Sequence, residues 1–108
     1  MAGAKIVVIY PRPKDIEAFE RVYANDHAPM VFPGFQGITK FVQTKVVGTP
    51  SGEPAAIQRI AELHFPSLDV LKKAASSKGA QDAVAHALAI STGGAPTILI
   101  CEESTTTS

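Results

Sequence analysis

The sequence predicts an α+β fold in which two strand-helix-strand units share one four-stranded antiparallel sheet. Three observations predict it. Four short apolar runs have the length of strands, helical spacing of apolar residues marks the segments between them, and stretches rich in Gly and Pro separate these elements. The 108 residues leave room for a single domain, which we place at 1–103, followed by a flexible tail rich in Ser and Thr at 104–108.

The first strand and the first helix are expected within the first thirty residues. The run KIVVIY at 5–10 is apolar on both faces and predicts a buried strand. Asp15 is a suitable N-cap for a helix that we expect to end near His27, because Pro29 disfavours helix at the residue before it. A turn-rich loop is expected at 33–37. The apolar side of this helix carries Ile16, Phe19, Tyr23, His27 and Met30.

The second and third strands are expected at 38–47 and 57–65. The loop between them is too long for a tight hairpin turn and suits a looser antiparallel connection. Alternation divides the third strand between two faces of the sheet. One face carries Ile57, Arg59, Ala61, Leu63 and Phe65, and the other carries Gln58, Ile60, Glu62 and His64.

Two helical stretches and a last strand complete the chain. Ser67 is a suitable N-cap for the first stretch, Gly79 is expected to interrupt it, and the second stretch follows at about 80–90. Gly93 and Gly94 end this second stretch, as glycine commonly does at helix C-termini. The last strand is expected at 97–102 and is apolar on both faces.

This order, β-α-β-β-α-β, is the ferredoxin-like arrangement. Right-handed crossovers place the helices on one face of the sheet and leave the other face uncovered. The first strand is nevertheless apolar on both sides, since Val7 and Ile9 alternate with Ile6 and Val8. Large apolar patches mark interaction sites, and two-fold dimers are the commonest assemblies. We therefore expect a homodimer whose two sheets face each other, a dimeric α+β barrel.

The composition argues against several classes of partner. Ten Lys and Arg balance ten Asp and Glu, so the chain has no net charge to attract nucleic acid or a membrane surface. No apolar run approaches the roughly 20 residues of a membrane span. The single cysteine, Cys101, and an N-terminus without the pattern of a signal peptide favour a reducing cytoplasm.

His27 is the best candidate catalytic residue. It extends the apolar side of Phe19 and Tyr23 to the expected end of the helix. The helix dipole there favours the charged ring and burial favours the neutral ring, so we expect the two influences to hold the pKa of His27 near neutrality. Such a pKa suits proton transfer. The alternative is a buried histidine whose ring bonds only to a backbone carbonyl.

Tyr10, Tyr23, Glu62 and His64 are the candidate substrate-binding residues. Either tyrosine hydroxyl can orient a polar group of a substrate, and a core tyrosine with one hydrogen bond is the alternative. Glu62 and His64 share the strand face directed away from the helices, where they either anchor a ligand in a cavity, form an ion pair across the dimer or lie at an exposed edge. His86 is expected to face solvent and receives no role.

No pattern predicts a cofactor or a metal. The sequence has no Gly-rich phosphate loop, no paired cysteines and no nucleophile elbow, so we expect no cofactor. His27, His64, Glu62 and Asp26 would supply a site of two histidines and a carboxylate, but nothing in their spacing fixes the geometry, and we expect no metal.

Four segments carry a resemblance to a known family. The segment VVIYPRPKDIEAFERVYANDHAPM (7–30) resembles its first strand, its first helix and the histidine that closes that helix. PGFQGITKF (33–41) resembles its second strand, RIAELHFPSLDVLKKAASSKGAQ (59–81) its third strand and following helix, and STGGAPTILICEE (91–103) its last strand. In the order and spacing of these segments, the chain resembles the EthD family of the dimeric α+β barrel superfamily.

The resemblance implies a homodimer with sheets packed face to face and a pocket between helices and sheet in each subunit. It places His27 at the recurrent histidine of the family and Glu62 at an acidic position, whereas His64 matches nothing in the pattern. The family is named for the degradation of ethyl tert-butyl ether, and its relatives are described as oxidoreductase-like. The wider superfamily includes cofactor-free monooxygenases and isomerases.

These observations lead to two expected functions, with a purely structural dimer that has no pocket as a weaker third. The first is an enzyme that binds a small apolar metabolite, aromatic or oxygenated, and uses His27 as general base or acid. It would be a cofactor-free oxidoreductase, of monooxygenase type, or an isomerase in the degradation of organic compounds. The alternative is a non-catalytic accessory protein that holds such a ligand for a partner oxygenase. Fold membership does not decide between the two.

Overall fold

The computed structural model describes residues 3–107 as four strands and a set of helical segments. The strands are β1 (Gly3–Pro11), β2 (Lys40–Lys45), β3 (Ile57–Phe65) and β4 (Thr97–Glu103). The helices are α1 (Ile16–Val22), a π-helical turn η1 (Tyr23–His27), a 3₁₀ turn η2 (Ala28–Met30), α2 (Val31–Gly34), α3 (Leu68–Ala75) and α4 (Lys78–Ile90). Residues 104–107 follow β4 without regular structure. Residues 1, 2 and 108, at the two ends of the predicted domain and tail, lie outside the described residues.

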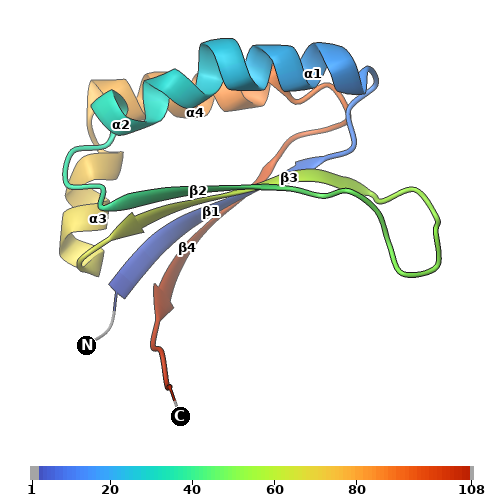
Figure 1. Ribbon diagram of the computed structural model, residues 1–108. Helices are drawn as coiled ribbons and strands as arrows, with labels where there is room; N and C mark the ends of the chain where they lie inside the picture. Colours follow the sequence, from blue (N-terminus) through green and yellow to red (C-terminus); the bar gives the residue numbers. More distant parts are fainter. Residues whose placement is uncertain (1–2, 108) are drawn as a thin grey trace.

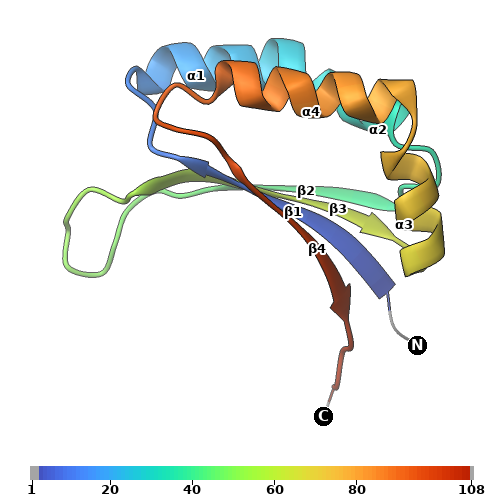
Figure 2. The same ribbon diagram turned by 180° about the vertical axis from the view of Figure 1, so that it is seen from behind.

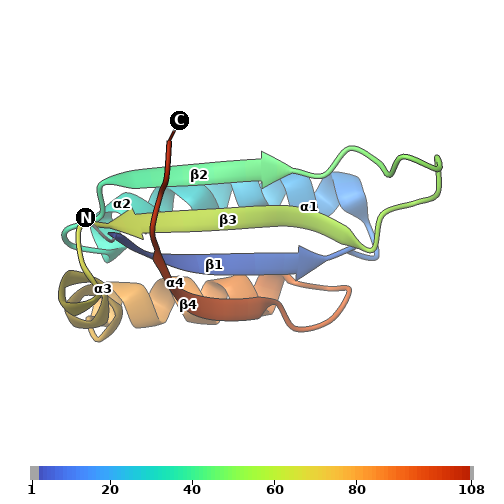
Figure 3. The same ribbon diagram turned by 90° about the horizontal axis from the view of Figure 1, so that it is seen from below.

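The four strands form one antiparallel sheet in the order β2-β3-β1-β4. The long helices lie together on one face of this sheet (Figures 1 and 2). A view onto the opposite face shows the four strands with the helices behind them (Figure 3). We call that opposite face the open face. The predicted α+β, ferredoxin-like fold is therefore confirmed. None of the helices in the described part of the chain is long and apolar enough to cross a membrane.

All four strands form where the sequence predicts them, but most of their ends differ from the predicted ones by one or two residues. The third predicted strand, at 57–65, is confirmed residue for residue as β3. The first and last strands are longer than predicted, and β2 is shorter, because pairing with neighbouring strands rather than composition sets where a strand ends.

The first helical region continues well past the predicted end at His27. In η1 the backbone N–H of Ala28 donates to the carbonyl of Tyr23, five residues back, and in η2 the N–H of Val31 donates to Ala28. A wide turn followed by a tight turn accommodates Pro29, which lacks an N–H to donate. Helix therefore resumes in α2, and the predicted loop at 33–37 begins only at Phe35.

The break between α3 and α4 lies at Ser76 and Ser77, not at Gly79 as predicted. Ser67 caps α3 as expected, and Ser77 caps α4 by accepting a hydrogen bond from the Ala80 N–H. Gly79 lies inside α4, where a β-carbon would stand 3.0 Å from the Cα of Gly34 in α2. Its lack of a side chain thus serves a close helix–helix approach instead of ending a helix.

A β-bulge changes the expected orientation of Gln58. The register between β1 and β3 shifts between Tyr10 and Pro11, so an extra residue lies opposite this step. Gln58, predicted on the open face, is instead buried, and its amide donates to Glu20 of α1 at 3.2 Å. Arg59 bonds the same carboxylate at 2.6 Å. The bulge thereby ties β3 to α1.

The core fills the space between sheet and helices in two adjoining clusters. The larger cluster is built on β1, β3, α2, α3 and α4 and includes Ile6, Phe35, Leu63, Phe65 and Leu71. The smaller cluster consists of Tyr10, Phe19, Tyr23 and Ala87. Val8 packs against both clusters, so the polar ends of the tyrosines lie beside an otherwise apolar core.

The molecule is flat, with one dimension about half of the other two. Its extents are 39 × 38 × 19 Å and its radius of gyration is 14.5 Å. A compact domain of this length has a radius of gyration of about 13 Å. The shape follows from the single layer of helices on a single sheet. On the open face, Figure 3 shows the end of β4 and the residues that follow it, up to 107, passing in front of the other strands.

Candidate functional site

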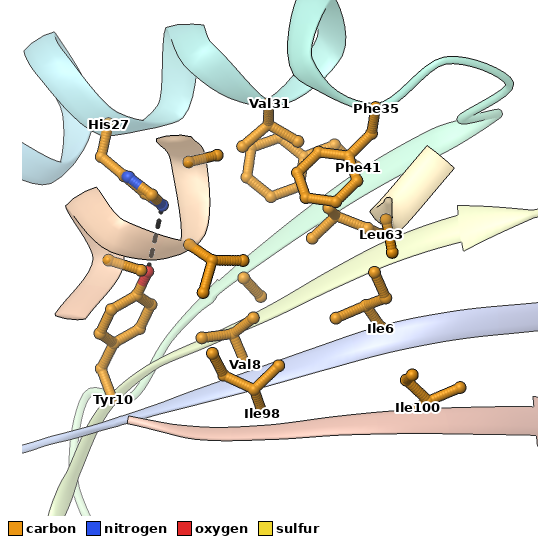
Figure 4. A pocket seen from close by; sticks show the side chains of 15 residues that line it. Ile6, Val8, Tyr10, His27, Val31, Phe35, Phe41, Leu63, Ile98 and Ile100 are labelled. Atoms are coloured by element: carbon orange, nitrogen blue, oxygen red, sulfur yellow. Dashed lines mark hydrogen bonds between the residues drawn. The ribbon is translucent and has the colours of Figure 1, made fainter. Parts of the chain in front are cut away.

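A cavity of about 130 Å³ lies between the sheet and the helices. Its walls come from β1, β2, β3, β4, α2, α3, α4 and the turn η1. Among the described residues that line it, Tyr10 and His27 carry the polar side chains and all the others are apolar. Figure 4 shows these two side chains together at one end, with Phe35, Phe41 and Ile100 toward the other. The pocket therefore has one polar end and one apolar end.

The pocket opens between α4 and β4. Val84 of α4 and Ile98 and Ile100 of β4 line it, yet these side chains are 38%, 37% and 59% exposed. The remaining wall residues named above are buried or half-buried. A ligand entering by this route would pass an apolar rim before it meets the polar end.

The turn η1 positions His27. Phe19, Tyr23, His27 and Val31 are all buried, which shows that a spacing of four residues is kept through the π-helical turn. Such turns insert an extra residue into a helix and occur often at functional sites. His27 is only 6% exposed and points from η1 toward the sheet (Figure 4).

Three side chains form a continuous hydrogen-bonded chain, which we call the Tyr10–His27–His86 chain. The hydroxyl of Tyr10 lies 3.2 Å from Nε2 of His27. Nδ1 of His27 lies 3.0 Å from Nδ1 of His86 on α4, and the two rings stack with their centroids 5.1 Å apart. Both ring nitrogens of His27 are thus occupied by side chains, so the alternative of a histidine that bonds only to a backbone carbonyl is wrong.

His86, which was expected to face solvent and was assigned no role, is only partly exposed. His86 is half-buried and contacts the candidate catalytic ring. The signal in the sequence was slight: His86 follows Ala83 by three positions and precedes Ala87, and both alanines are buried. Only the packing of α4 against η1, far apart in the sequence, reveals the pair.

Burial decides the protonation of the pocket groups. Together with the smaller effect of the neighbouring His86, it lowers the pKa of His27 to about 4. The prediction of a pKa near neutrality was therefore wrong, because helix continues beyond His27 and no helix end lies there to favour the cation. Burial also raises the pKa of Tyr10 far above its usual value. At pH 7 both groups are neutral, and each can exchange a proton with the other.

Tyr23 lies behind the pocket, not in its wall. Its ring makes edge contact with Tyr10 at 5.7 Å and stacks on Phe19 at 5.8 Å, and the guanidinium of Arg59 lies 4.9 Å from its centroid. Burial raises the pKa of Tyr23 to about 12. Its hydroxyl has no hydrogen-bond partner among the residues that the structure describes. Tyr23 supports the ring of Tyr10 from the side.

Glu62 and His64 lie on the open face, separated from the pocket by the sheet. Lys5 bonds Glu62 at 2.9 Å and lies 3.2 Å from Glu103, and His64 lies within 3.5 Å of both carboxylates. We call these four side chains the polar quartet. The bond to Lys5 lowers the pKa of Glu62, and the bond to Glu62 raises that of Lys5. The structure therefore brings Tyr10 and His27 together and leaves Glu62 and His64 apart from them.

The sheet also separates the residues that were considered as metal ligands. His27 points into the pocket, whereas Glu62 and His64 lie across the sheet from it. Within residues 3–107, no group of three or more His, Cys, Asp or Glu side chains is close enough to hold a metal ion.

Two relatives resemble the chain over nearly its whole length. The structure of an ethyl tert-butyl ether (EthD) family protein from Bacillus halodurans C-125 matches with a TM-score of 0.85 and 26% identity, covering 94% of this chain and 99% of that one. An uncharacterized 11.0 kDa protein from the thcB-thcC intergenic region of Rhodococcus erythropolis is 28% identical over 101 residues, which cover 94% of this chain and 95% of the relative.

More distant structures share the fold. A variant of SnoaB, a cofactor-independent oxygenase from Streptomyces nogalater, matches with a TM-score of 0.61 and 11% identity over 99% of this chain and 95% of that one. A dimeric ferredoxin-like protein of unknown function from Jannaschia sp. CCS1 matches with a TM-score of 0.64 and 16% identity over 97% of this chain and all of that one. At such identities the likeness shows the fold alone.

The sequence also matches a family model directly. The model of the EthD domain matches residues 12–87, which is most of the chain and includes η1, β3 and most of α4. The resemblance expected from the four sequence segments is thereby confirmed. The chain belongs to the EthD domain family.

Proposed function

We propose that this protein binds a small, largely apolar molecule with one oxygen-bearing group, and that it acts on this molecule by proton transfer through Tyr10 and His27. One observation carries the proposal: the neutral Tyr10–His27 pair, joined at 3.2 Å, forms the polar end of an otherwise apolar pocket. Pockets that fix a ligand with few polar groups in an apolar surround are typical of small-molecule sites.

The size of the cavity limits the ligand. Its volume is about 130 Å³. A dry apolar cavity of about 150 Å³ holds benzene. A single ring, or an aliphatic chain of similar volume, therefore fits, with its hydroxyl or carbonyl oxygen at Tyr10 and its apolar part against Phe35 and Phe41.

The reaction would be proton abstraction from, or donation to, the oxygen-bearing end of the ligand. His27 is the general base or acid, and Tyr10 holds the ligand oxygen. Loss of a proton from a phenol or from a carbon next to a carbonyl gives an electron-rich anion, which can isomerise or react with oxygen without a cofactor. SnoaB, described as a cofactor-independent oxygenase, supports this chemistry on the same fold.

We also propose that the chain forms a homodimer through the open face and works in the cytoplasm. Val7 and Ile9 of β1, Ile60 of β3 and the 45% exposed Leu99 of β4 lie on this face. A second copy would cover these side chains and thicken the flat protomer. The Jannaschia protein, described as dimeric, supports the assembly. The polar quartet would lie in or beside this interface, so Glu62 and His64 serve the dimer and not the ligand.

Ligand recognition can be tested with 4-methylphenol and toluene, which differ by one hydroxyl. We expect calorimetry to show tighter binding of 4-methylphenol to the wild type. Tyr10→Phe should reduce this preference by about tenfold, because one buried hydrogen bond is lost. Tyr23→Phe is the matched control, since its hydroxyl lies outside the pocket wall. Equal binding of the two ligands by the wild type would overturn the proposal.

A non-catalytic accessory role is the second candidate. The scarcity of polar side chains in the pocket favours it, since Tyr10 and His27 are the polar groups lining the described cavity. Native mass spectrometry can identify a ligand that co-purifies with the protein. Incubation of that ligand with wild type and with His27→Gln then separates the roles. Conversion by the wild type that His27→Gln abolishes supports an enzyme, whereas an unchanged ligand under air supports the accessory role.

A further inference from the structure

The half-buried position of His86 gives the pocket a path to solvent. His27 is almost fully buried, so its ring has little direct contact with water. His86 contacts His27 at 3.0 Å through Nδ1 and retains exposed surface on α4. His86 does not line the cavity and so does not touch the ligand. In the Tyr10–His27–His86 chain, His86 lies between the buried ring of His27 and the solvent.

The atoms that face each other fix the direction of the hydrogen bonds. Two Nδ1 atoms 3.0 Å apart share one proton, so one ring donates and the other accepts. A phenol is a good donor and a poor acceptor, whereas a bare imidazole nitrogen is a good acceptor. The resting direction therefore runs from the Tyr10 hydroxyl to Nε2 of His27, and from Nδ1–H of His27 to Nδ1 of His86.

We propose that His86 is the solvent-side end of a proton relay that runs from the pocket through the Tyr10 hydroxyl and the His27 ring. The inference rests on the proposed function, since it assumes a ligand that gives up a proton at Tyr10. It adds a positioning residue that lies outside the pocket wall and holds the proton that leaves.

The transfer balances without any oxidant or reductant. The ligand O–H bond breaks and its proton binds the Tyr10 oxygen, while the Tyr10 proton moves to Nε2 of His27. The Nδ1 proton of His27 moves to Nδ1 of His86. His86 now carries the positive charge and the ligand carries the negative charge. Release of the Nε2 proton of His86 to water completes the export, and the reverse sequence returns a proton to the ligand.

The surroundings favour charge on His86 over charge on His27. Burial penalises a cation on the inner ring, whereas water can solvate the outer ring. The other titratable side chains on the elements that meet here are Tyr23 and Asp26 of η1 and Lys78 and Asp82 of α4. Lys78 and Asp82 pair with each other at 2.7 Å on the exposed side of α4.

Ring ¹⁵N shifts of labelled protein test the relay without a ligand. When His86 becomes charged, its Nδ1–H must donate to His27, which then moves from the Nδ1–H to the Nε2–H tautomer while staying neutral. As the pH is lowered, we expect this change of the His27 tautomer in the wild type and in Asp82→Asn, an exposed control on the same helix. We expect no such change in His86→Gln, whose amide can hydrogen-bond but cannot take up a proton. A His27 tautomer that stays the same as the pH is lowered would overturn the relay.

A ligand arm uses 4-nitrophenol, whose ionisation is visible by absorbance. Burial disfavours the phenolate, as it does at Tyr10, and proton transfer to His86 opposes this effect, so the bound phenol should ionise at a lower pH in the wild type than in His86→Gln. His86→Gln should reduce the ionised fraction at that pH by roughly tenfold or more with little change in affinity. Full ionisation in His86→Gln would overturn the relay. If no variant binds 4-nitrophenol, the proposed ligand class fails, and the tautomer experiment still decides the relay.

Discussion

At the scale of single residues, the neutral state of His27 decides what the pocket can do. Its pKa of about 4 means that the ring is uncharged at pH 7, and burial keeps Tyr10 protonated as well. A ligand therefore meets no ionic group in the cavity wall. It would meet a neutral hydroxyl and a neutral imidazole, which can hydrogen-bond to an oxygen atom of an otherwise apolar ligand.

The depressed pKa of His27 predicts how stability depends on pH. The unfolded chain takes up a proton near its ordinary value of 6.5, whereas the folded chain takes it up only near 4. Between these values the unfolded state binds more protons, so stability falls as pH falls. We expect a loss of about 2 kcal/mol in the free energy of unfolding between pH 7 and pH 5.

Urea denaturation at pH 7 and pH 5 measures this loss. His27→Gln removes the titrating ring, so its stability should change less over the same interval, and the difference between the two proteins isolates His27. Carboxylates such as Glu62, whose pKa is lowered in the folded state, contribute at lower pH and leave this window clear. Parallel pH profiles for the two proteins would contradict the prediction.

The candidate residue could be found from the sequence, but its chemistry could not. His27 follows Phe19 and Tyr23 at four-residue spacing, and this periodicity places it on the buried side of a helix. Its pKa depends on the depth of burial and on His86, 59 residues away in the chain. A contact between residues so far apart leaves no local pattern in the sequence, and His86 was therefore predicted to face solvent.

At the scale of elements, the contact between Gly34 and Gly79 holds α2 against α4. A β-carbon on Gly34 would stand 3.0 Å from the carbonyl oxygen of Gly79, and one on Gly79 would stand equally close to Gly34. Both contacts are with backbone atoms, which cannot rotate away. The sequence predicts Gly34 in a turn-rich loop and Gly79 at a break between helices, because a close approach between distant segments leaves no local signal.

Gly79→Val should therefore destabilise the fold. Valine forces α2 and α4 apart, and we expect a loss of about 2 kcal/mol in the free energy of unfolding by urea denaturation. Gly48→Val is the matched control, since a β-carbon there meets nothing within 4 Å. It should change stability by no more than about 0.5 kcal/mol. Equal effects of the two substitutions would show that the helix contact is not tightly packed.

At the scale of the whole molecule, the open face predicts self-association. Leu99→Lys places a charge on this face, and light scattering should then show monomer where the wild type is a dimer. Leu88→Lys is the control, because Leu88 is 50% exposed on α4 and lies away from the sheet. A wild type that is monomeric at micromolar concentration would contradict the proposed homodimer.

The overall fold could be predicted because independent features of the sequence favour the same arrangement. Strand runs, helix caps and the order of elements all favour one arrangement, and the sheet confirms it. The bulge at Gln58 and the π-helical turn could not be predicted, because each depends on tertiary pairing that alternation and spacing do not encode.

The mouth of the pocket and its polar end are built by different residues. Val84, Ile98 and Ile100 surround the entrance, and none of them contacts the Tyr10–His27–His86 chain through a hydrogen bond. Substitutions at the entrance can therefore change which molecules are admitted while the reacting groups stay as they are. Selectivity and reactivity can diverge independently in this scaffold, and related proteins with different ligands could retain one chemistry behind altered entrances.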